Sequence, residues 1–234
     1  MKGLARTFFV VVILLLLHSG VVSVSAMNTG FSTQLLPTTD RDLFLKNINI
    51  TVLSDEPNKK AIECFSVNKN GNIAIGYSNG NNKTICIYAA DGNFQYGYSF
   101  NCSGNLGIEL YDDILNVYFV RSDIALSLYP TGEVESILKI LNTSDNNKYW
   151  NDYVFSTKQV VDDWEYILKN DAGILNGFSS SYSQLIKVNI HNQEELVVYN
   201  ATPGYFSSIV VFVLVFMFII FAGLVAFNKY RFKR

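Results

Sequence analysis

Short runs of apolar residues alternate with tight turn signals through the middle of the chain. The clearest case is the stretch 85–98, where Asp91-Gly92 separates two runs rich in β-branched and aromatic residues. An Asp-Gly pair fits a two-residue type I′ turn, whose twist matches that of the flanking strands. Asn70-Gly71 stands between two earlier runs in the same way. Helical spacing of apolar residues is nearly absent, so the pattern predicts a β domain over 43–200.

The predicted strands form three units with a period of about 40 residues. The units cover about 61–100, 104–141 and 153–200, with four strands in each. The strands are predicted at 62–67, 72–77, 84–89 and 93–100, at 106–111, 114–120, 124–128 and 133–141, and at 153–159, 164–169, 184–190 and 194–199. Gly92, in the third turn of the first unit, aligns with Gly132 in the second unit.

Four strands at this spacing resemble the blades of a β-propeller, as found in extracellular and cell-envelope proteins. The likeness covers about residues 61–200 and lies in strand spacing and turn position, without a Trp-Asp signature. Closed propellers contain about four to eight blades. Three blade-like antiparallel meanders, with one further strand predicted within 43–53, therefore imply an open or partial propeller. A β-sandwich built from the same strands is the alternative.

The N-terminus has the three zones of a secretory signal peptide. A positively charged start precedes an apolar run at 7–17, and Val24-Ser25-Ala26 supplies small residues at the place that a signal peptidase recognises. The apolar run is too short to span a bilayer well. We predict that 1–26 is a signal peptide cleaved after Ala26, with an uncleaved signal anchor as the alternative. The polar, unpatterned residues 27–42 are predicted to be a flexible leader.

The C-terminus predicts a transmembrane helix over 206–227. These residues carry no charge and are apolar all round. At about 1.5 Å per residue the helix measures about 33 Å, enough for a hydrocarbon core of about 30 Å. The tail 228–234 contains basic and no acidic residues, and positive flanks stay in the cytoplasm. We therefore predict a single-pass cell-membrane protein with its bulk outside, joined to the helix by a linker at 201–205.

The charge balance excludes one large class of partners. The chain has 18 basic and 20 acidic residues, and six of the basic ones lie in 1–26 and 205–234. The remaining part carries 12 basic against 20 acidic residues, a net charge of −8. Because an acidic surface repels phosphate backbones, a nucleic-acid partner is not expected.

The sequence shows no pattern typical of a metal site. The cysteines Cys64, Cys86 and Cys102 are an odd number without a short-spaced pair, and His191 is the only histidine outside the signal peptide. A Cys/His metal site is therefore not expected. The cysteines are predicted to be small buried residues in strands, and His191 to be a solvated turn residue.

Paired carboxylates do not predict a catalytic site either. They occur at Asp112-Asp113, Asp162-Asp163 and Glu194-Glu195. Neighbours on a strand point to opposite faces, so no such pair forms an acid/base dyad by itself. We predict no catalytic, cofactor-binding or metal-binding residue, and hence no enzyme.

Two features point to contacts with other molecules. The pair Tyr149-Trp150 lies in a connection rich in Asn and Asp, and exposed Tyr and Trp are enriched at interfaces. It is the candidate interaction site, with packing as the alternative. Asn-x-Ser/Thr sequons mark surface loops if the host glycosylates them. They begin at Asn49, Asn82, Asn101, Asn142 and Asn200.

These observations predict a membrane-anchored, non-enzymatic interaction or sensing module outside the cytoplasm. It is expected to bind a protein partner or to self-associate through its first or third unit. The alternatives are an accessory subunit of a membrane complex and an envelope hydrolase with carboxylates from distant strands. A cleft with converging carboxylates would favour the hydrolase, and a bare edge strand would favour the accessory subunit.

Overall fold

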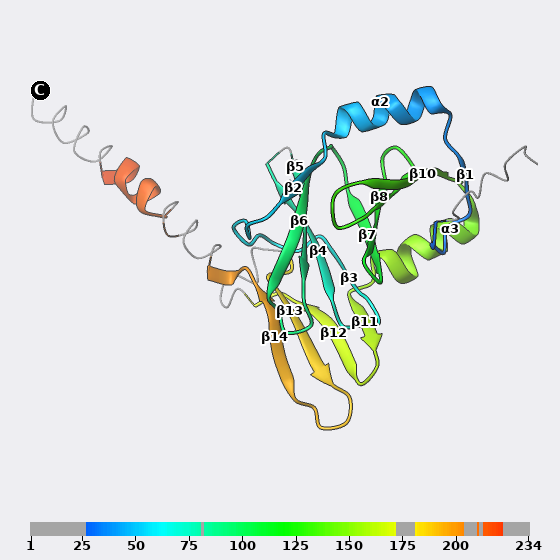
Figure 1. Ribbon diagram of the computed structural model, residues 1–234. Helices are drawn as coiled ribbons and strands as arrows, with labels where there is room; N and C mark the ends of the chain where they lie inside the picture. Colours follow the sequence, from blue (N-terminus) through cyan, green and yellow to red (C-terminus); the bar gives the residue numbers. More distant parts are fainter. Residues whose placement is uncertain (1–26, 81, 172–180, 204–209, 211–212, 222–234) are drawn as a thin grey trace, which may run out of the picture.

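Three antiparallel β-sheets make up most of the chain in the computed structural model (Figure 1). The structure describes residues 27–80, 82–171, 181–203, 210 and 213–221. The protein is mainly β, and none of the three sheets closes on itself.

Each predicted unit of four strands forms one sheet, so the three meanders are confirmed. The first sheet has the order β2-β6-β5-β4-β3, the second β1-β10-β9-β8-β7 and the third β11-β12-β13-β14. The first contains β2 (Thr51–Leu53), β3 (Cys64–Val67), β4 (Ile73–Asn79), β5 (Asn82–Tyr88) and β6 (Phe94–Asn101). The second contains β1 (Thr33–Leu35), β7 (Leu106–Tyr111), β8 (Ile114–Phe119), β9 (Ile124–Leu128) and β10 (Val134–Ile140). The third contains β11 (Lys158–Val161), β12 (Trp164–Lys169), β13 (Gln184–Asn189) and β14 (Glu195–Asn200).

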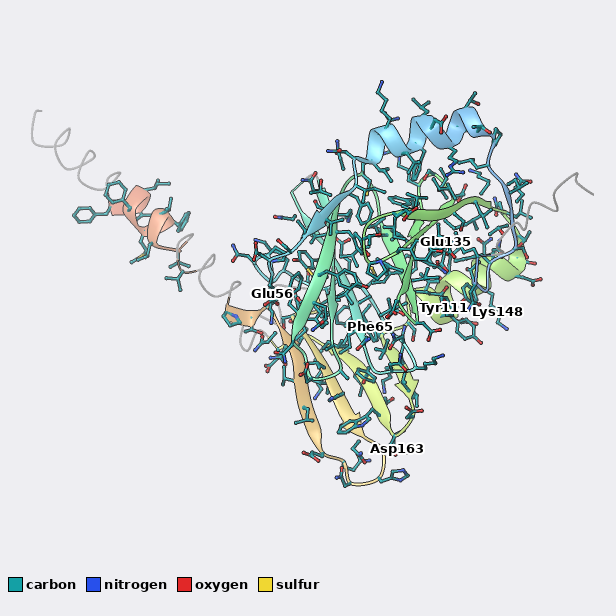
Figure 2. The ribbon with its side chains drawn as sticks, viewed as in Figure 1. Glu56, Phe65, Tyr111, Glu135, Lys148 and Asp163 are labelled. Atoms are coloured by element: carbon teal, nitrogen blue, oxygen red, sulfur yellow. The ribbon has the colours of Figure 1, made fainter. Side chains whose placement is uncertain are left out.

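The sheets do not stack in chain order, because the first sheet lies between the other two. Alternate residues of its strands point to opposite faces. Ile85 and Phe100 pack against the second sheet, while Phe65 and Tyr88 pack against the third. Phe65 lies near the centre of the side-chain packing (Figure 2) and is 1% exposed. Both faces of the first sheet are therefore buried, as in the core of a layered domain.

The N-terminal segment is ordered, so the prediction of a flexible leader at 27–42 is wrong. β1 pairs with β10, helix α2 (Thr38–Ile48) follows, and β2 pairs with β6. The strand predicted within 43–53 is therefore mostly helix. Phe31 anchors the segment, because its ring lies 4.8 Å from that of Tyr118. A single buried ring and strands of three residues leave no periodicity for sequence analysis to detect.

The third unit also begins differently from its prediction. The range 153–159 was expected to be a strand, but helix α3 (Ser144–Tyr149) runs into a π-helical turn, η1 (Trp150–Val154), and β11 starts only at Lys158. Thr143 caps α3, since its hydroxyl accepts from the Asn146 N–H at 3.2 Å. The bare Cα of Gly107 leaves room for η1, because a Cβ there would lie 2.2 Å from Val154 Cγ1.

The ends of the chain carry predictions that the described residues do not test. The predicted signal peptide 1–26 lies outside them, as do the tail 228–234 and parts of the predicted span 206–227. Residues 210 and 213–221 are helical. Among the described residues, no helix is both long and apolar enough to cross a membrane.

Candidate functional site

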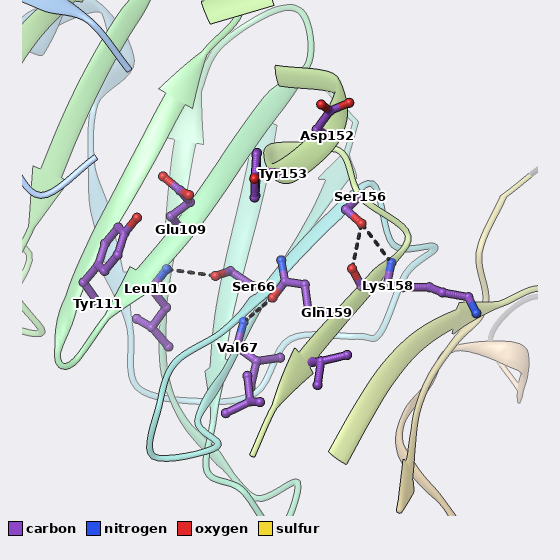
Figure 3. A pocket seen from close by; sticks show the side chains of 12 residues that line it. Ser66, Val67, Glu109, Leu110, Tyr111, Asp152, Tyr153, Ser156, Lys158 and Gln159 are labelled. Carbon is purple, nitrogen blue, oxygen red and sulfur yellow. Dashed lines mark hydrogen bonds between the residues drawn. The ribbon is translucent and has the colours of Figure 1, made fainter. Parts of the chain in front are cut away.

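A cleft of about 420 Å³ opens where one edge strand of each sheet approaches the others (Figure 3). The strands are β3, β7 and β11, each the first of its meander, and η1 closes one end. The lining residues are Ser66, Val67, Glu109, Leu110, Tyr111, Asp152, Tyr153, Ser156, Lys158, Gln159, Val160 and Val161. A junction of several elements with converging polar groups is a common place for a binding site.

Side chains in this cleft satisfy the backbone edges of the strands. The Val67 N–H donates to Gln159 Oε1 at 2.9 Å, and Gln159 Nε2 donates to the Phe65 carbonyl at 3.3 Å. The amide of Gln159 thus pairs with the outer edge of β3 as another strand would. Similarly, the Leu110 N–H of β7 donates to Ser66 Oγ at 3.0 Å. These bonds join three sheet edges that would otherwise be open.

The one basic residue of the cleft is turned away from its acidic groups. Lys158 Nζ pairs with Glu165 Oε1 at 3.3 Å, and Figure 3 shows its side chain pointing away from Glu109. Its backbone is held by Ser156, whose hydroxyl donates to the Lys158 carbonyl at 2.6 Å. The carboxylates of Glu109 and Asp152 therefore set the charge of the cleft.

Glu109 is the most unusual of the lining groups. The hydroxyls of Tyr118 and Tyr149 both donate to its carboxylate. Burial raises the pKa of Glu109, and the hydrogen bonds from these two tyrosines and from Tyr111 only partly oppose the shift. A carboxyl group held between tyrosines, with its pKa raised, is the kind of group found at functional sites.

A buried polar network connects Glu109 to the N-terminal segment. The Tyr118 hydroxyl also lies 2.8 Å from Thr29 Oγ1. Asn116 Nδ2 donates to the Asn28 carbonyl at 2.6 Å, and Ser127 Oγ donates to Asn116 Oδ1 at 2.5 Å. Burial, followed by the negative charge of Glu109, raises the pKa of Tyr118 well above its ordinary value. The N-terminal segment therefore helps to position the site.

The predicted interaction pair, Tyr149-Trp150, packs between the N-terminal segment and the residues that line the cleft. Tyr149 and Trp150 are half-buried, and both rings pack on Phe31 with centroids 4.7 and 4.6 Å away. Tyr149 also stacks on Tyr153 at 5.1 Å, and Tyr153 is 61% exposed beside the cleft. Both rings therefore pack against the N-terminal segment, and the neighbouring Tyr153 is the exposed ring.

The other residues singled out from the sequence lie away from the cleft. Asp112 lies in a turn, and its Oδ1 atom is 2.8 Å from Lys69 Nζ. His191 is exposed in a hairpin turn, where Nε2 lies 3.1 Å from Asp163 Oδ1. Figure 2 shows Asp163 at the far tip of the third sheet. The predicted turn position of His191 is confirmed, and the described part of the chain contains no cluster of three metal-ligating side chains.

The cysteines and sequons have contrasting environments. The thiols of Cys64 and Cys86 are buried and unpaired, and burial raises the pKa of Cys64 to about 12. Such a thiol is a poor nucleophile at neutral pH. All five sequon asparagines are exposed, namely Asn49, Asn82, Asn101, Asn142 and Asn200.

A second hollow, of about 620 Å³, lies beside β4 and β5. Lys83 Nζ there donates to Ser78 Oγ at 2.6 Å and to Glu63 Oε2 at 2.5 Å. A hydroxyl beside a lysine is one form of activated nucleophile. Here the Ser78 hydroxyl also donates to the Glu63 carboxylate, and the Lys83 ammonium group is paired with the same carboxylate, so the three side chains form one closed network. We therefore interpret this arrangement as structural: the three side chains hold their chain segments together.

Comparison with known proteins assigns no family: no protein-family model matches the chain, and no curated protein matches it in sequence. The residues of the cleft are therefore the basis for a functional proposal.

Proposed function

We propose that the chain is a membrane-anchored binding module that takes a cationic group of a protein partner into the cleft between β3, β7 and β11. The observation that carries this proposal is the charge of the cleft. Glu109 and Asp152 line it together with two tyrosines, while its single lysine is paired with Glu165. Carboxylates and aromatic faces are the groups that bind lysine and arginine side chains.

Two further features support a protein ligand of this kind. The net charge of −8 outside the two ends favours the approach of a basic partner. Tyr153 is exposed at the rim, and exposed tyrosines are typical of protein interfaces. The cleft is small, so it fits one or two side chains of the partner and not a folded domain.

The location in the cell is part of the proposal. Residues 1–26 would direct secretion, 206–227 would span the membrane and 228–234 would remain in the cytoplasm. The meeting of β3, β7 and β11 supports a partial propeller, since blades of a propeller surround a central channel.

A binding titration of the full chain in detergent tests the proposed ligand. A lysine- and arginine-rich peptide should bind, and an acidic peptide of equal length should not. Glu109→Gln and Asp152→Asn should each weaken binding by about tenfold, the effect of losing one charge-assisted contact of about 1.4 kcal/mol. Asp145→Asn, an exposed change on α3 outside the cleft, is the matched control. Equal affinity of all four proteins for the basic peptide would refute the proposal.

One observation favours a hydrolase as the second candidate. Two carboxyl groups share the cleft, and the pKa of one of them, Glu109, is raised by burial. Glycosidases use such a pair as acid and base or nucleophile. A panel of chromogenic glycosides separates the two functions. Turnover that Glu109→Gln and Asp152→Asn both abolish would establish the hydrolase, and its absence would leave the binding module.

A further inference from the structure

The outer edge of the third sheet differs from the outer edges of the other two. β2 pairs with β6 and β1 pairs with β10, and each added strand has three residues with the sequence Thr-x-Leu. β14 is the corresponding last strand of the third meander. Within the described residues, no strand pairs with its outer edge. This edge therefore presents unpaired backbone groups, the feature that invites another strand.

The direction of these groups follows from the hairpin between β13 and β14. The Asn189 N–H donates to the Glu194 carbonyl at 2.9 Å, so this pair is hydrogen-bonded. In an antiparallel ladder, hydrogen-bonded and non-hydrogen-bonded pairs alternate. Leu196 is then the next residue bonded to β13, and the N–H and C=O groups of Glu195 and Val197 point outward.

A β-bulge limits the open edge at its other end. Tyr199 pairs with Leu185 and Val197 with Ile186, which leaves Val198 as the extra residue. The Val198 carbonyl oxygen lies 3.1 Å from the place that a Cβ would take on Gly92, so the first sheet approaches the edge here. The accessible stretch is thus 195–197, the same length as β1 and β2.

Two of the three side chains of this stretch are apolar and exposed. Leu196 is 41% exposed and Val197 54% exposed. The carboxylate of Glu195 is already paired with Lys169 Nζ at 2.8 Å. An exposed apolar edge without a free charge is favourable for strand pairing, because it lacks the charged side chains that usually prevent pairing at sheet edges.

We propose that β14 pairs antiparallel with β14 of a second copy of this chain, about a two-fold axis at Leu196. In this register Glu195 faces Val197 of the second copy, and Val197 faces Glu195 of the second copy. All four residues have outward backbone groups, so four hydrogen bonds form. Leu196 faces its own equivalent in a non-hydrogen-bonded pair, and no like charges are opposite each other.

The register explains why a second copy is the occupant. A two-fold axis at Val197 would instead place Glu195 opposite Tyr199, whose backbone is directed toward Leu185 in β13. Only the axis at Leu196 matches every outward group with another. A symmetric contact of one patch with itself is the commonest form of oligomer. The contact also goes beyond the proposed cleft function, since β11 and β14 are opposite edges of the third sheet.

Cysteine cross-linking of the full chain in membranes tests the pairing. Residues facing each other in a non-hydrogen-bonded pair have Cβ atoms about 4.5–5.5 Å apart, which small shifts bring within disulfide range. Leu196→Cys should give at least about ten times more disulfide-linked dimer than Leu43→Cys under mild oxidation, a gain that follows from the high effective concentration of paired thiols. Leu43, which is 59% exposed on helix α2 and lies outside the cleft, is the matched control.

Light scattering of the full chain in detergent gives a second measurement. The wild-type mass should rise with concentration toward that of a dimer. Leu196→Lys should remain monomeric because two lysines would face each other, whereas Leu43→Lys should behave as wild type. Equal cross-linking of both cysteine variants, or a dimer that Leu196→Lys leaves intact, would overturn the pairing. Glu109→Gln should leave the dimer unchanged, which separates this inference from the function of the cleft.

Discussion

The first and third sheets are built from the same four-stranded pattern but occupy different surroundings. The first has both faces covered and a fifth strand on its outer edge, so six of the seven residues of β4 are less than half exposed and five are fully buried. The third has four strands, and its β14 is exposed over most of its length. Repetition of a sequence pattern therefore fixes the strands, while neighbouring segments decide which of them stay accessible. Both proposed contact sites involve the third sheet.

Truncation to alanine should have its largest effect on the free energy of unfolding in the first sheet and a much smaller one at the edge of the third. Phe100→Ala should lower the free energy of unfolding by about 3–5 kcal/mol, because it removes a ring that is 0% exposed from the core between the first and second sheets. Val197→Ala, on the exposed edge of the third sheet, should change it by less than about 0.5 kcal/mol. Denaturant unfolding of the full chain measures both, and similar losses would contradict the difference in packing.

The contact between the two sheets should show an intermediate effect. Gln159→Ala should cost about 1–3 kcal/mol, since it leaves the Val67 N–H and the Phe65 carbonyl without their partner. Gln95→Ala is the matched control, because Gln95 is exposed and makes one local bond. If both variants unfold at the same denaturant concentration, the side-chain closure of β3 contributes nothing to stability.

The pH dependence of stability should show the smallest of the three effects, and Glu109 should be the group that causes it. The folded-state pKa of Glu109 is raised by burial, so its contribution is fully present below the ordinary pKa of a glutamate. It is lost as the pH rises through the higher folded-state value. Wild type should therefore lose stability over that range, and Glu109→Gln should not. Thermal unfolding from pH 4 to pH 8 measures this, with exposed Glu194→Gln expected to retain the wild-type slope.

The strands could be predicted from the sequence because each depends on residues next to it. Alternation, Asp-Gly and Asn-Gly turns and β-branched runs located 11 of the 12 strands predicted within the three units to within two residues of their bounds. The exception, 153–159, contains residues that favour a strand. Its first part is helical because Thr143 caps α3 and the rings of Tyr149 and Trp150 pack on Phe31. That ring is more than a hundred residues away in the sequence, beyond the reach of a local pattern.

The cleft could not be predicted for the same reason. Glu109 is an isolated acid within an apolar strand, and nothing beside it indicates that Tyr149 will donate to it. Adjacent carboxylates in the sequence give no indication of this site, because Glu109 and Asp152 come from different elements. Charge was more informative: the acidic balance of the chain agrees with the carboxylates that line the cleft.

The pairing of β1 with β10 has a consequence for the order of folding. Thr33 is opposite Ile140, so β1, the first strand of the described residues, can pair only after the last strand of the second sheet has been synthesised. Contacts this distant in sequence slow folding, because a long loop must close before they form. The first sheet, whose strands lie between residues 51 and 101, can form earlier, whereas the second sheet is completed only after β10 has been synthesised. Until then, β1 and the outer edge of β9 remain unpaired, and the need of the nascent chain for a chaperone should be greatest in that interval.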